Sequence, residues 1–375
     1  QGGGLNRLNV ETSRFTRYGP DPNNPDNLND DIVNAVYVDH NGDVWVGTKN
    51  GLNLFDRSKN GFIVYKNDSN DPASLSDDDV RCILEDRFGT LWVGTRNGGL
   101  NKFDPSTKKF IRFQYDPENP DSLSDNRLFC IMEDSSGLLW LGTRGGGFNR
   151  FDPVSGNFSR FTEEDGLPNN VVYGIIEDDR GMLWLSTNNG LAAFDPNTKR
   201  FRTYDVTDGL QSNEFNFGAY FKGRDGEMYF GGLNGFNVFH PANIKDNPYV
   251  PNVVITDFQI FNKSIPVGEW ENGRVVLEQS ITETDHLFLS HADNVFSFEF
   301  SALHYSMPEK NEYAYIMEGF EKDWNYVGNR NFVTYTNLSP GKYTFRVKGS
   351  NSDGIWNETG VFLIITIKPP LFQTK

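Results

Sequence analysis

The sequence predicts an all-β protein in which β-propeller blades precede an immunoglobulin-like β-sandwich. Three observations support this fold class. A tryptophan-bearing strand recurs at near-regular intervals, a Gly-rich turn follows each copy, and short alternating strands separated by turn signals fill the last part of the chain. Strands that recur with a period of roughly 40–50 residues are typical of propellers. About seven short strands within roughly 100 residues are typical of an immunoglobulin-like sandwich.

The repeating unit is clearest at residues 91–105, which read as two short strands joined by a Gly-rich turn. Its tryptophan recurs at intervals of 47, 48 and 44 residues, and Tyr229 follows 45 residues later in a divergent fifth copy: Trp45, Trp92, Trp140 and Trp184. Each repeat divides into four strands, and the first two are apolar at successive positions. Such runs indicate strands that are covered on both faces. We therefore expect the tryptophans in the core, rather than exposed as a platform for sugar stacking.

The blades are expected to occupy residues 1–245. Residues 2–18 supply only the third and fourth strands of a leading blade, and the last repeat ends near His240 without a clear fourth strand. The prediction is therefore a partial propeller, with five or more four-stranded blades of an expected seven. Because the chain starts at Gln1, inside a repeat, we expect a piece of a longer protein, either an open arc or a propeller that other residues complete.

The character of the sequence changes after Pro241. Prolines punctuate residues 246–286, which we assign to a linker with one strand at 253–261. Residues 287–370 alternate between apolar and polar positions and form the predicted sandwich. We expect the tyrosines of this part in the core, with their hydroxyls bonded to the backbone.

The loops that connect one blade to the next are long and rich in Pro, Asp and Asn. They cover residues 21–31, 68–79, 116–126, 163–170 and 206–214. Because the turns of a four-strand meander alternate between its two rims, these loops share a rim with the Gly-rich turns. Long loops on a rigid scaffold are where binding residues concentrate. We therefore expect the ligand site on this rim.

Six residues of this rim are candidate ligand contacts: Lys49, Arg81, Arg96, Arg144, Tyr173 and Asn188. Four of them follow the Gly-Thr or Ser-Thr pair of a repeat, whereas Arg81 and Tyr173 lie near the starts of first strands and are expected to face the mouth of the channel. Guanidinium groups can bind hydroxyls or a carboxylate. The alternative is that these side chains pair with the acidic loops or remain in solvent.

Composition and motifs exclude several other functions. The formal net charge of −16 disfavours duplex nucleic acid and anionic membrane surfaces as partners. The longest apolar run, 361–367, is too short to span a bilayer. Loops 21–31 and 116–125 have oxygen ligands that could suit calcium, but Asx turns explain them equally well. No catalytic or metal-binding motif occurs, so we expect no catalytic residues, no metal and no cofactor.

The two cysteines, Cys82 and Cys130, fall at the same place in consecutive repeats. Equivalent points on neighbouring blades should be too distant for a disulfide. We therefore interpret them as small buried residues.

The repeats resemble those of bacterial two-component sensor propellers, notably at residues 92–95 and 99–104. The C-terminal part resembles the triple-tyrosine (Y_Y_Y) sandwich that follows such propellers, on Tyr313, Tyr315, Tyr335 and the run 340–347. Residues 368–372 are similar to the stretch that leads into the membrane helix of these receptors, so residues 371–375 are expected to begin a membrane-proximal segment.

The resemblance implies the periplasmic (extracytoplasmic) part of an inner-membrane sensor histidine kinase or hybrid kinase, attached to the membrane only through a following helix. It implies a small-molecule ligand, often a glycan-derived oligosaccharide, and a homodimer formed through the C-terminal sandwich. The kinase would lie outside these residues, so the chain itself is expected not to be an enzyme. The alternatives are a propeller glycosidase or lyase and a periplasmic propeller that binds other proteins.

Overall fold

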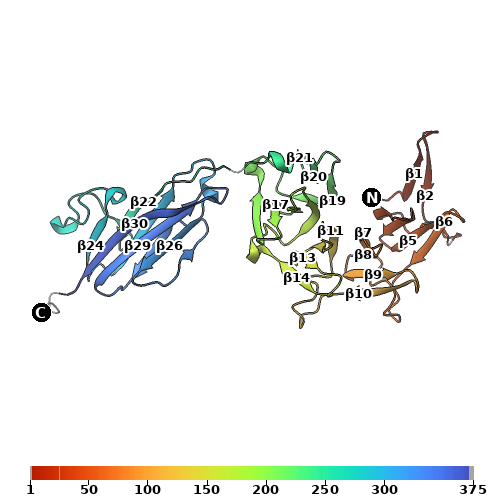
Figure 1. The fold of residues 1–375 in the computed structure, drawn as a ribbon, viewed down its shortest axis with the longest axis horizontal. Helices are drawn as coiled ribbons and strands as arrows, with labels where there is room; N and C mark the ends of the chain where they lie inside the picture. Colours follow the sequence, from red (N-terminus) through yellow and green to blue (C-terminus); the bar gives the residue numbers. More distant parts are fainter. Residues whose placement is uncertain (1, 25, 246, 371–375) are drawn as a thin grey trace. The chain divides into compact units, whose positions relative to one another are not determined.

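The computed structural model describes residues 2–24, 26–245 and 247–370. These residues form two compact units, divided between Ile244 and Lys245. Apart from short 3₁₀ turns, all regular structure in the described residues is β-strand, which confirms the all-β prediction (Figure 1). In the described part of the chain there is no helix with the length and apolarity to cross a membrane. Residues 371–375, predicted to be membrane-proximal, lie outside the described residues.

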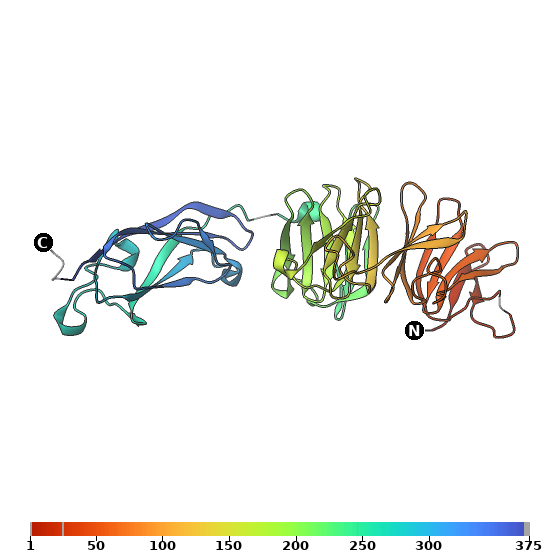
Figure 2. The same cartoon turned by 90° about the horizontal axis from the view of Figure 1, so that it is seen from below.

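The first unit consists of antiparallel meanders, each of which is one propeller blade (Figures 1 and 2). A two-stranded sheet comes first, with β1 (Leu5–Asn9) and β2 (Arg14–Tyr18). Blade 1 has β3 (Val33–Val38), β4 (Val44–Thr48), β5 (Gly51–Asp56) and β6 (Gly61–Tyr65). Blade 2 has β7 (Val80–Glu85), β8 (Leu91–Thr95), β9 (Leu100–Asp104) and β10 (Lys109–Phe113). Blade 3 has β11 (Leu128–Glu133), β12 (Leu139–Thr143), β13 (Phe148–Phe151) and β14 (Phe158–Phe161).

Blade 4 has β15 (Val172–Glu177), β16 (Leu183–Thr187), β17 (Gly190–Asp195) and β18 (Arg200–Tyr204). Blade 5 has three strands: β19 (Phe215–Lys222), β20 (Met228–Gly232) and β21 (Gly235–Phe239). Short 3₁₀ turns lie at η1 (Glu163–Asp165), η2 (Val206–Asp208) and η3 (Pro241–Asn243). Within the described residues β21 pairs only with β20, so it forms an edge, and Phe236 on it is 66% exposed.

The tryptophans of the repeats form the seams between blades. Each is at most 5% exposed, which confirms that they belong to the core. Each packs against the phenylalanine that ends or nearly ends the third strand of the following blade. The ring-centroid distances are 5.3 Å for Trp45–Phe103, 5.4 Å for Trp92–Phe151, 5.7 Å for Trp140–Phe194 and 4.8 Å for Trp184–Phe239. Aromatic pairs of this kind contribute about 0.5–1.5 kcal/mol beyond the area that they bury.

In blades 1 to 4 an aspartate at the end of the first strand, buried in blades 2 to 4 and partly buried in blade 1, holds the tryptophan of the same blade. The indole N–H donates to the carboxylate at 2.6–3.3 Å, in the pairs Trp45–Asp39, Trp92–Asp86, Trp140–Asp134 and Trp184–Asp178. Blade 5 replaces both partners, because Gly223 stands at the aspartate position and Tyr229 at the tryptophan position. The Tyr229 hydroxyl donates instead to Glu227 at 2.9 Å. Because both partners are replaced together, blade 5 has no buried indole N–H that lacks an acceptor, and such an unpaired donor would destabilise the fold.

Small residues let the first and second strands of one blade approach the next blade. Gly94 faces Cys82 across the β7–β8 pair, and Gly142 faces Cys130 across β11–β12. A Cβ on Gly142 would lie 2.5 Å from the Cys130 sulfur. Both thiols are free, and burial raises the pKa of Cys130 to about 12, so this thiol stays protonated and unreactive. The cysteines are therefore small packing residues, as expected.

The second unit is a sandwich of two sheets (Figure 1). One sheet has the order β23 (Lys263–Ser264), β22 (Val253–Ile260), β25 (Val295–Ala302) and β28 (Phe332–Thr336). The other has the order β24 (His286–Ser290), β30 (Trp356–Lys368), β29 (Gly341–Ser350), β26 (Tyr313–Glu318) and β27 (Asn325–Tyr326). The 3₁₀ turns are η4 (Glu271–Gly273), η5 (Ile281–Glu283) and η6 (Pro308–Lys310). Among the strands of this unit in the described residues, β24 and β30 are the one pair that runs parallel.

The core of the sandwich is aromatic. Phe298 stacks on Phe345 across the two sheets at 4.6 Å between ring centroids. Tyr313, Tyr315 and Tyr335 are buried, as predicted. The hydroxyl of Tyr313 meets the backbone, where it accepts from Ala302, and that of Tyr343 donates to the Ser339 carbonyl at 2.9 Å, as predicted. The hydroxyls of Tyr315 and Tyr335 differ from the prediction, because they bond to the side chains of Arg330 and Glu321.

The stretch assigned to a linker, 246–286, is largely part of the sandwich. Its predicted strand is β22, which pairs with β25 over most of its length and contributes the buried Phe258. The residues before β22 are also bound to this unit. Asn351 donates to the carbonyls of Asn247 and Tyr249 at 2.8 Å each, and Asn247 donates its N–H to Asp353 at 2.6 Å. Periodicity revealed the strand but not its partner, which lies about 40 residues further along the chain.

Candidate functional site

The long loops and the Gly-rich turns lie on the same rim, as the meander topology predicts. The residue after the repeat's threonine donates its backbone N–H to the residue just before the first strand. The bonds are Lys49 to Ile32 (3.0 Å), Arg96 to Asp79 (2.8 Å) and Arg144 to Arg127 (2.9 Å). These bonds fix the candidate side chains next to the inner ends of the blades.

A β-bulge at the second residue of each first strand directs one side chain inward. The pairing register shifts there in blades 1 to 4, at Asn34, Arg81, Phe129 and Tyr173. In blade 5 the shift extends over residues 216–219. Bulges commonly re-aim a side chain next to a binding site.

The bulged residues of blades 2 to 5 meet in a cluster that we call the axial cluster: Arg81, Phe129, Tyr173 and Phe217. The ring of Phe129 lies 5.2 Å from that of Tyr173 and 5.4 Å from that of Phe217. The guanidinium of Arg81 lies over the Phe217 ring at 5.6 Å. The cluster therefore joins four blades at the inner end of the rim.

Arg81 and Arg96 share one carboxylate. Asp79, which is 7% exposed, accepts from Arg81 at 2.9 Å and from Arg96 at 3.4 Å. It also accepts from the Asn34 amide at 3.1 Å. No acceptor among the described residues meets the buried Nε of Arg81. Two guanidinium groups thus face one carboxylate, which leaves a net positive charge for an acceptor-rich ligand.

Tyr173 and Asn188 are bonded to each other, with the hydroxyl donating to the amide oxygen at 2.6 Å. Burial raises the pKa of Tyr173, the nearby Glu214 raises it further, and Arg144 opposes both, so the hydroxyl stays protonated. The exposed Arg144 therefore lies close to this pair. Lys49 is exposed on blade 1, and no bond in the described residues ties it to the other five. The structure thus groups five of the six candidates along blades 2 to 4, and whether they bind a ligand stays a prediction.

Several residues of this rim escaped the sequence analysis. Phe129 occupies the same repeat position as Arg81 and Tyr173, so alignment of the repeats could have found it. Phe217 could not be found in this way, because the four-residue register shift of β19 displaces it. Asp79 was overlooked as one carboxylate among many in an acidic loop.

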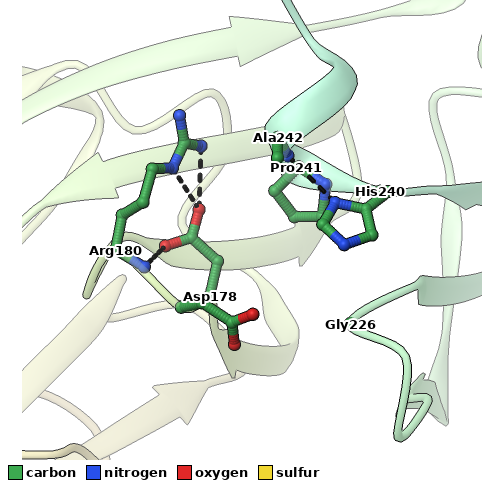
Figure 3. Close-up of a pocket in the computed structure, with 7 residues that line it drawn as sticks. Asp178, Arg180, Gly226, His240, Pro241 and Ala242 are labelled. Atoms are coloured by element: carbon green, nitrogen blue, oxygen red, sulfur yellow. Dashed lines mark hydrogen bonds and ion pairs between the residues drawn. The ribbon is translucent and has the colours of Figure 1, made fainter.

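The opposite rim holds a small cavity between blades 4 and 5, shown in Figure 3. Its volume is about 50 Å³, which suits water rather than a sugar. Arg180 donates to Asp178 at 2.8 and 3.2 Å, and His240 accepts the N–H of Ala242 at 3.2 Å (Figure 3). His240 also lies against Gly226, where a Cβ would be 2.8 Å from its Nε2. These contacts lie within blade 4 or within blade 5, and we interpret them as structural.

The structure offers no metal centre. The described residues contain no group of three or more His, Cys, Asp or Glu side chains that could hold an ion. The carboxylates of the long loops bond to their own backbone in Asx turns, as in Asn23 N–H to Asp21 at 2.9 Å and Glu118 N–H to Asp116 at 3.0 Å. Asx turns therefore account for the oxygen-rich loops.

Comparison with known families matches both units. Residues 27–50, 74–97, 122–145 and 166–189 match the two component regulator propeller repeat. Residues 304–368 match the Y_Y_Y domain.

Solved structures and one characterised relative agree with these matches. The extracellular domain of the hybrid two-component system BT3049 from B. thetaiotaomicron is 30% identical with a TM-score of 0.73, and the match covers 98% of this chain and 48% of that one. The extracellular domain of BT4673 from the same bacterium is 26% identical with a TM-score of 0.51, over 98% and 48% of the two chains. Histidine kinase P4 of Formosa agariphila is 38% identical over 182 residues, which are 48% of this chain and 13% of the kinase.

The chain spans about half the length of these solved domains and a small part of the kinase. The chain therefore carries segments that match the two component regulator propeller repeat and the Y_Y_Y domain, and it is similar to the extracellular domains of two-component sensors.

Proposed function

We propose that this chain is the ligand-sensing, extracytoplasmic portion of a membrane-anchored two-component sensor histidine kinase. The observation that carries the proposal is the similarity, over 98% of the chain at 30% identity, to the extracellular domain of a hybrid two-component system. The net charge of −16 agrees with a role that involves neither nucleic acid nor an anionic lipid surface. The cytoplasmic kinase belongs, in this proposal, to the longer protein.

The ligand in this proposal is an oligosaccharide that binds at the loop-rich rim. Arg96 and Arg144 would bond to hydroxyl or carboxylate oxygens, and Tyr173 and Asn188 would add one donor and one acceptor. The bulged aromatic rings of the axial cluster would contact the apolar faces of a sugar. Guanidinium, amide and hydroxyl groups beside partly exposed aromatic rings suit such a ligand, which is polar at its edges and apolar on its faces.

Signal transmission would then be a population shift between two geometries of a homodimer formed through the sandwich. A ligand changes such an equilibrium only by its difference in affinity for the two states. A coupling of about 1–3 kcal/mol would change kinase output roughly 5- to 150-fold.

A printed array of neutral and acidic oligosaccharides, probed with the full extracytoplasmic protein, tests the proposal. Binding should be saturable, and Arg144→Ala should weaken it about tenfold or more, because a charged hydrogen bond is lost. Arg224→Ala, which removes an exposed arginine from the opposite rim, should have no effect. Absence of binding across the array would overturn the oligosaccharide proposal.

The same assay addresses the alternatives of a propeller glycosidase or lyase. Such enzymes need two carboxylates that oppose each other across a cleft, roughly 5–10 Å apart. The buried carboxylates Asp86, Asp134 and Asp178 each hold a tryptophan, and Asp79 holds two arginines. No specific observation favours catalysis, and turnover of any bound oligosaccharide would reverse this conclusion.

A further inference from the structure

A second cavity opens on the loop-rich rim between blades 2 and 3. It has a volume of about 470 Å³ and is lined by Asn97, Tyr115, Ser124, Asp125, Asn126 and Arg127. We call it the Tyr115 pocket. Ligand pockets in proteins are roughly 300–1,000 Å³. Asn97 directly follows Arg96, and Arg127 accepts the backbone N–H of Arg144, so the pocket adjoins two candidate ligand contacts.

Tyr115 is held in one orientation although its side chain is 44% exposed. Its backbone N–H donates to the Asn126 side chain at 2.7 Å. The guanidinium of Arg160 lies over the ring at 5.7 Å and is itself bonded to the carbonyl of Ser122 at 3.0 Å. One face of the ring is therefore covered, which leaves the other for a ligand.

Asp125 and Arg127 form a two-point ion pair beside this ring. Nη2 of Arg127 lies 2.6 Å from one carboxylate oxygen, and its Nε lies 3.0 Å from the other. The Asp125 carboxylate raises the pKa of Arg127, so the pair stays charged on both sides and neutral as a whole. Such a pair presents donors and acceptors together without a net charge.

Gly145 makes room for the ion pair. A Cβ at this position would lie 3.2 Å from Nη2 of Arg127 and 3.5 Å from a carboxylate oxygen of Asp125. The same turn position is asparagine in the other four blades: Asn50, Asn97, Asn189 and Asn234. The backbone of Gly145 does not need glycine, because its φ is not positive. The glycine is thus explained by the space that the ion pair occupies.

Comparison of the blades shows that this pocket departs from a constant scaffold. The bond from the Tyr115 N–H to the following loop recurs in the other blades at Asn67, Glu163 and Val206. The aromatic side chain is therefore present only at blade 2 among these equivalent positions. Likewise, Arg127 directly precedes the first strand of its blade, and in the other blades this position holds Ile32, Asp79, Val171 and Glu214. Tyr115, Arg127 and Gly145 thus all depart from the residues at equivalent positions, and all three lie at the junction of blades 2 and 3. This combination indicates a role beyond folding.

We propose that the Tyr115 pocket is a subsite for one uncharged pyranose ring of the oligosaccharide. The apolar C–H face of the sugar stacks on the open face of Tyr115, and its hydroxyls bond to Asn97, Asp125 and Arg127. An uncharged ring is the better occupant because the Asp125–Arg127 pair has no charge left to neutralise. The inference rests on the proposed function, since it assigns a further part of the same ligand to the same rim.

The experiment compares three variants, Tyr115→Ala, Tyr115→Phe and Gly145→Asn, with the wild-type extracytoplasmic protein on the oligosaccharide array. Each protein is then titrated with the neutral oligosaccharide that binds best and with its homologue that is one sugar shorter. Tyr115→Ala should weaken binding of the longer ligand about tenfold and leave the shorter one unchanged. Tyr115→Phe keeps the ring and should bind as the wild type does. Gly145→Asn should also weaken the longer ligand, because its side chain crowds the ion pair.

Phe88→Ala is the matched control, because Phe88 is an exposed aromatic residue of the same blade on the opposite rim. It should bind both ligands as the wild type does. Equal affinity of Tyr115→Ala and wild type for the longer ligand would overturn the subsite and leave the proposed function standing. Preferential binding of a sugar that is charged at this position would also overturn it. Failure of the wild type to bind any member of the array would overturn both proposals.

Discussion

Asp134 uses both oxygens of its carboxylate to support blade 3. One oxygen accepts the hydroxyl and the N–H of Ser136 at 2.6 and 2.8 Å and the N–H of Leu138 at 3.0 Å, and the other accepts the indole N–H of Trp140 at 2.6 Å. Burial by itself raises the pKa of this carboxyl, but these bonds outweigh it and hold the pKa below its usual range. The folded state therefore stabilises the charged form of the Asp134 carboxyl.

We predict that Asp134→Asn lowers the free energy of unfolding by about 1–3 kcal/mol. The amide can replace one acceptor, but its NH₂ group then faces the indole N–H, which is also a donor. Urea denaturation of the two proteins measures the loss. Glu118→Gln, a change in an exposed loop, should leave the midpoint unchanged. Equal midpoints for Asp134→Asn and wild type would contradict the role of this carboxylate.

The pH dependence of the same pair follows from the sign of the shift. The pKa of Asp134 is lower in the folded state than in the unfolded state, so its stabilisation is present above the unfolded value of about 3.9. It is lost as the pH falls through the folded pKa. The stability difference between wild type and Asp134→Asn should therefore shrink below about pH 4.

The contribution of His40 to stability has the opposite pH dependence. Its imidazole is bonded to Glu85 of the next blade, and this hydrogen bond, together with the charge of Glu85, raises the pKa of His40. A raised pKa stabilises the folded state below the unfolded value of about 6.5, and this contribution is lost as the pH rises through the folded pKa. We predict that His40→Ala lowers the melting temperature more at pH 5.5 than at pH 8.5, measured by calorimetry in the same buffer series. An equal effect at both values would show that the pair does not titrate with folding.

At the scale of the strands, blade spacing depends on residues without large side chains. A Cβ on Gly94 would come closer than 3.0 Å to the sulfur of Cys82 and within 3.3 Å of Leu128 on blade 3. The strand β8 is buried along its whole length, so neither neighbour has room to withdraw. The backbone of Gly94 is not in the left-handed region, so space alone requires glycine.

We predict that Gly94→Ala destabilises the propeller by about 1–3 kcal/mol through overpacking. Cys82→Ala removes the opposing sulfur and should restore part of this loss in the double variant. Thermal unfolding of the four proteins in this double-mutant cycle gives the coupling energy. Gly19→Ala is the control, because nothing lies within 4 Å of its Cβ position. Additive effects of the two changes would show that Cys82 is not the obstacle.

The strands themselves could be predicted from the sequence because their signals are local. The tryptophan interval and the apolar runs located blades 1 to 4, and the missing fourth strand of the last repeat was correctly expected at His240. The partners of β22 and the inward side chains at the bulges could not be predicted in this way. A bulge shifts the alternation by one residue, and strand pairing joins residues that are distant in sequence. The grouping of Arg81 with Asp79 and Phe217 therefore needed coordinates.

At the scale of the whole molecule, the connection between the two units is short. The first unit ends at Ile244, and the residues from Asn247 onward are bonded to the sandwich through Asn351 and Asp353. Further along, Leu303 donates its N–H to the carbonyl of Asn252 at 2.7 Å. Along the sequence, two residues separate Ile244 from Asn247.

If the longer protein is the sensor kinase that we propose, insertion of Gly-Ser-Gly between Ile244 and Lys245 should uncouple ligand binding from kinase output. Ligand affinity should stay the same, because the insertion touches neither unit, whereas ligand-dependent kinase output should fall. The same insertion between Val154 and Ser155, at an exposed turn, is the control and should preserve the response. An undiminished response with the longer connection would rule out mechanical coupling through this segment.

The unpaired edge of blade 5 affects how self-association of this polypeptide is interpreted. Backbone donors and acceptors on such an edge can recruit a strand from a neighbouring molecule. A concentration-dependent dimer therefore has two possible origins, contact through β21 and contact through the sandwich. Val238→Lys places a charge on the edge strand and should abolish the first kind of dimer alone. Sedimentation of this variant separates the dimer that we propose through the sandwich from association through the edge strand.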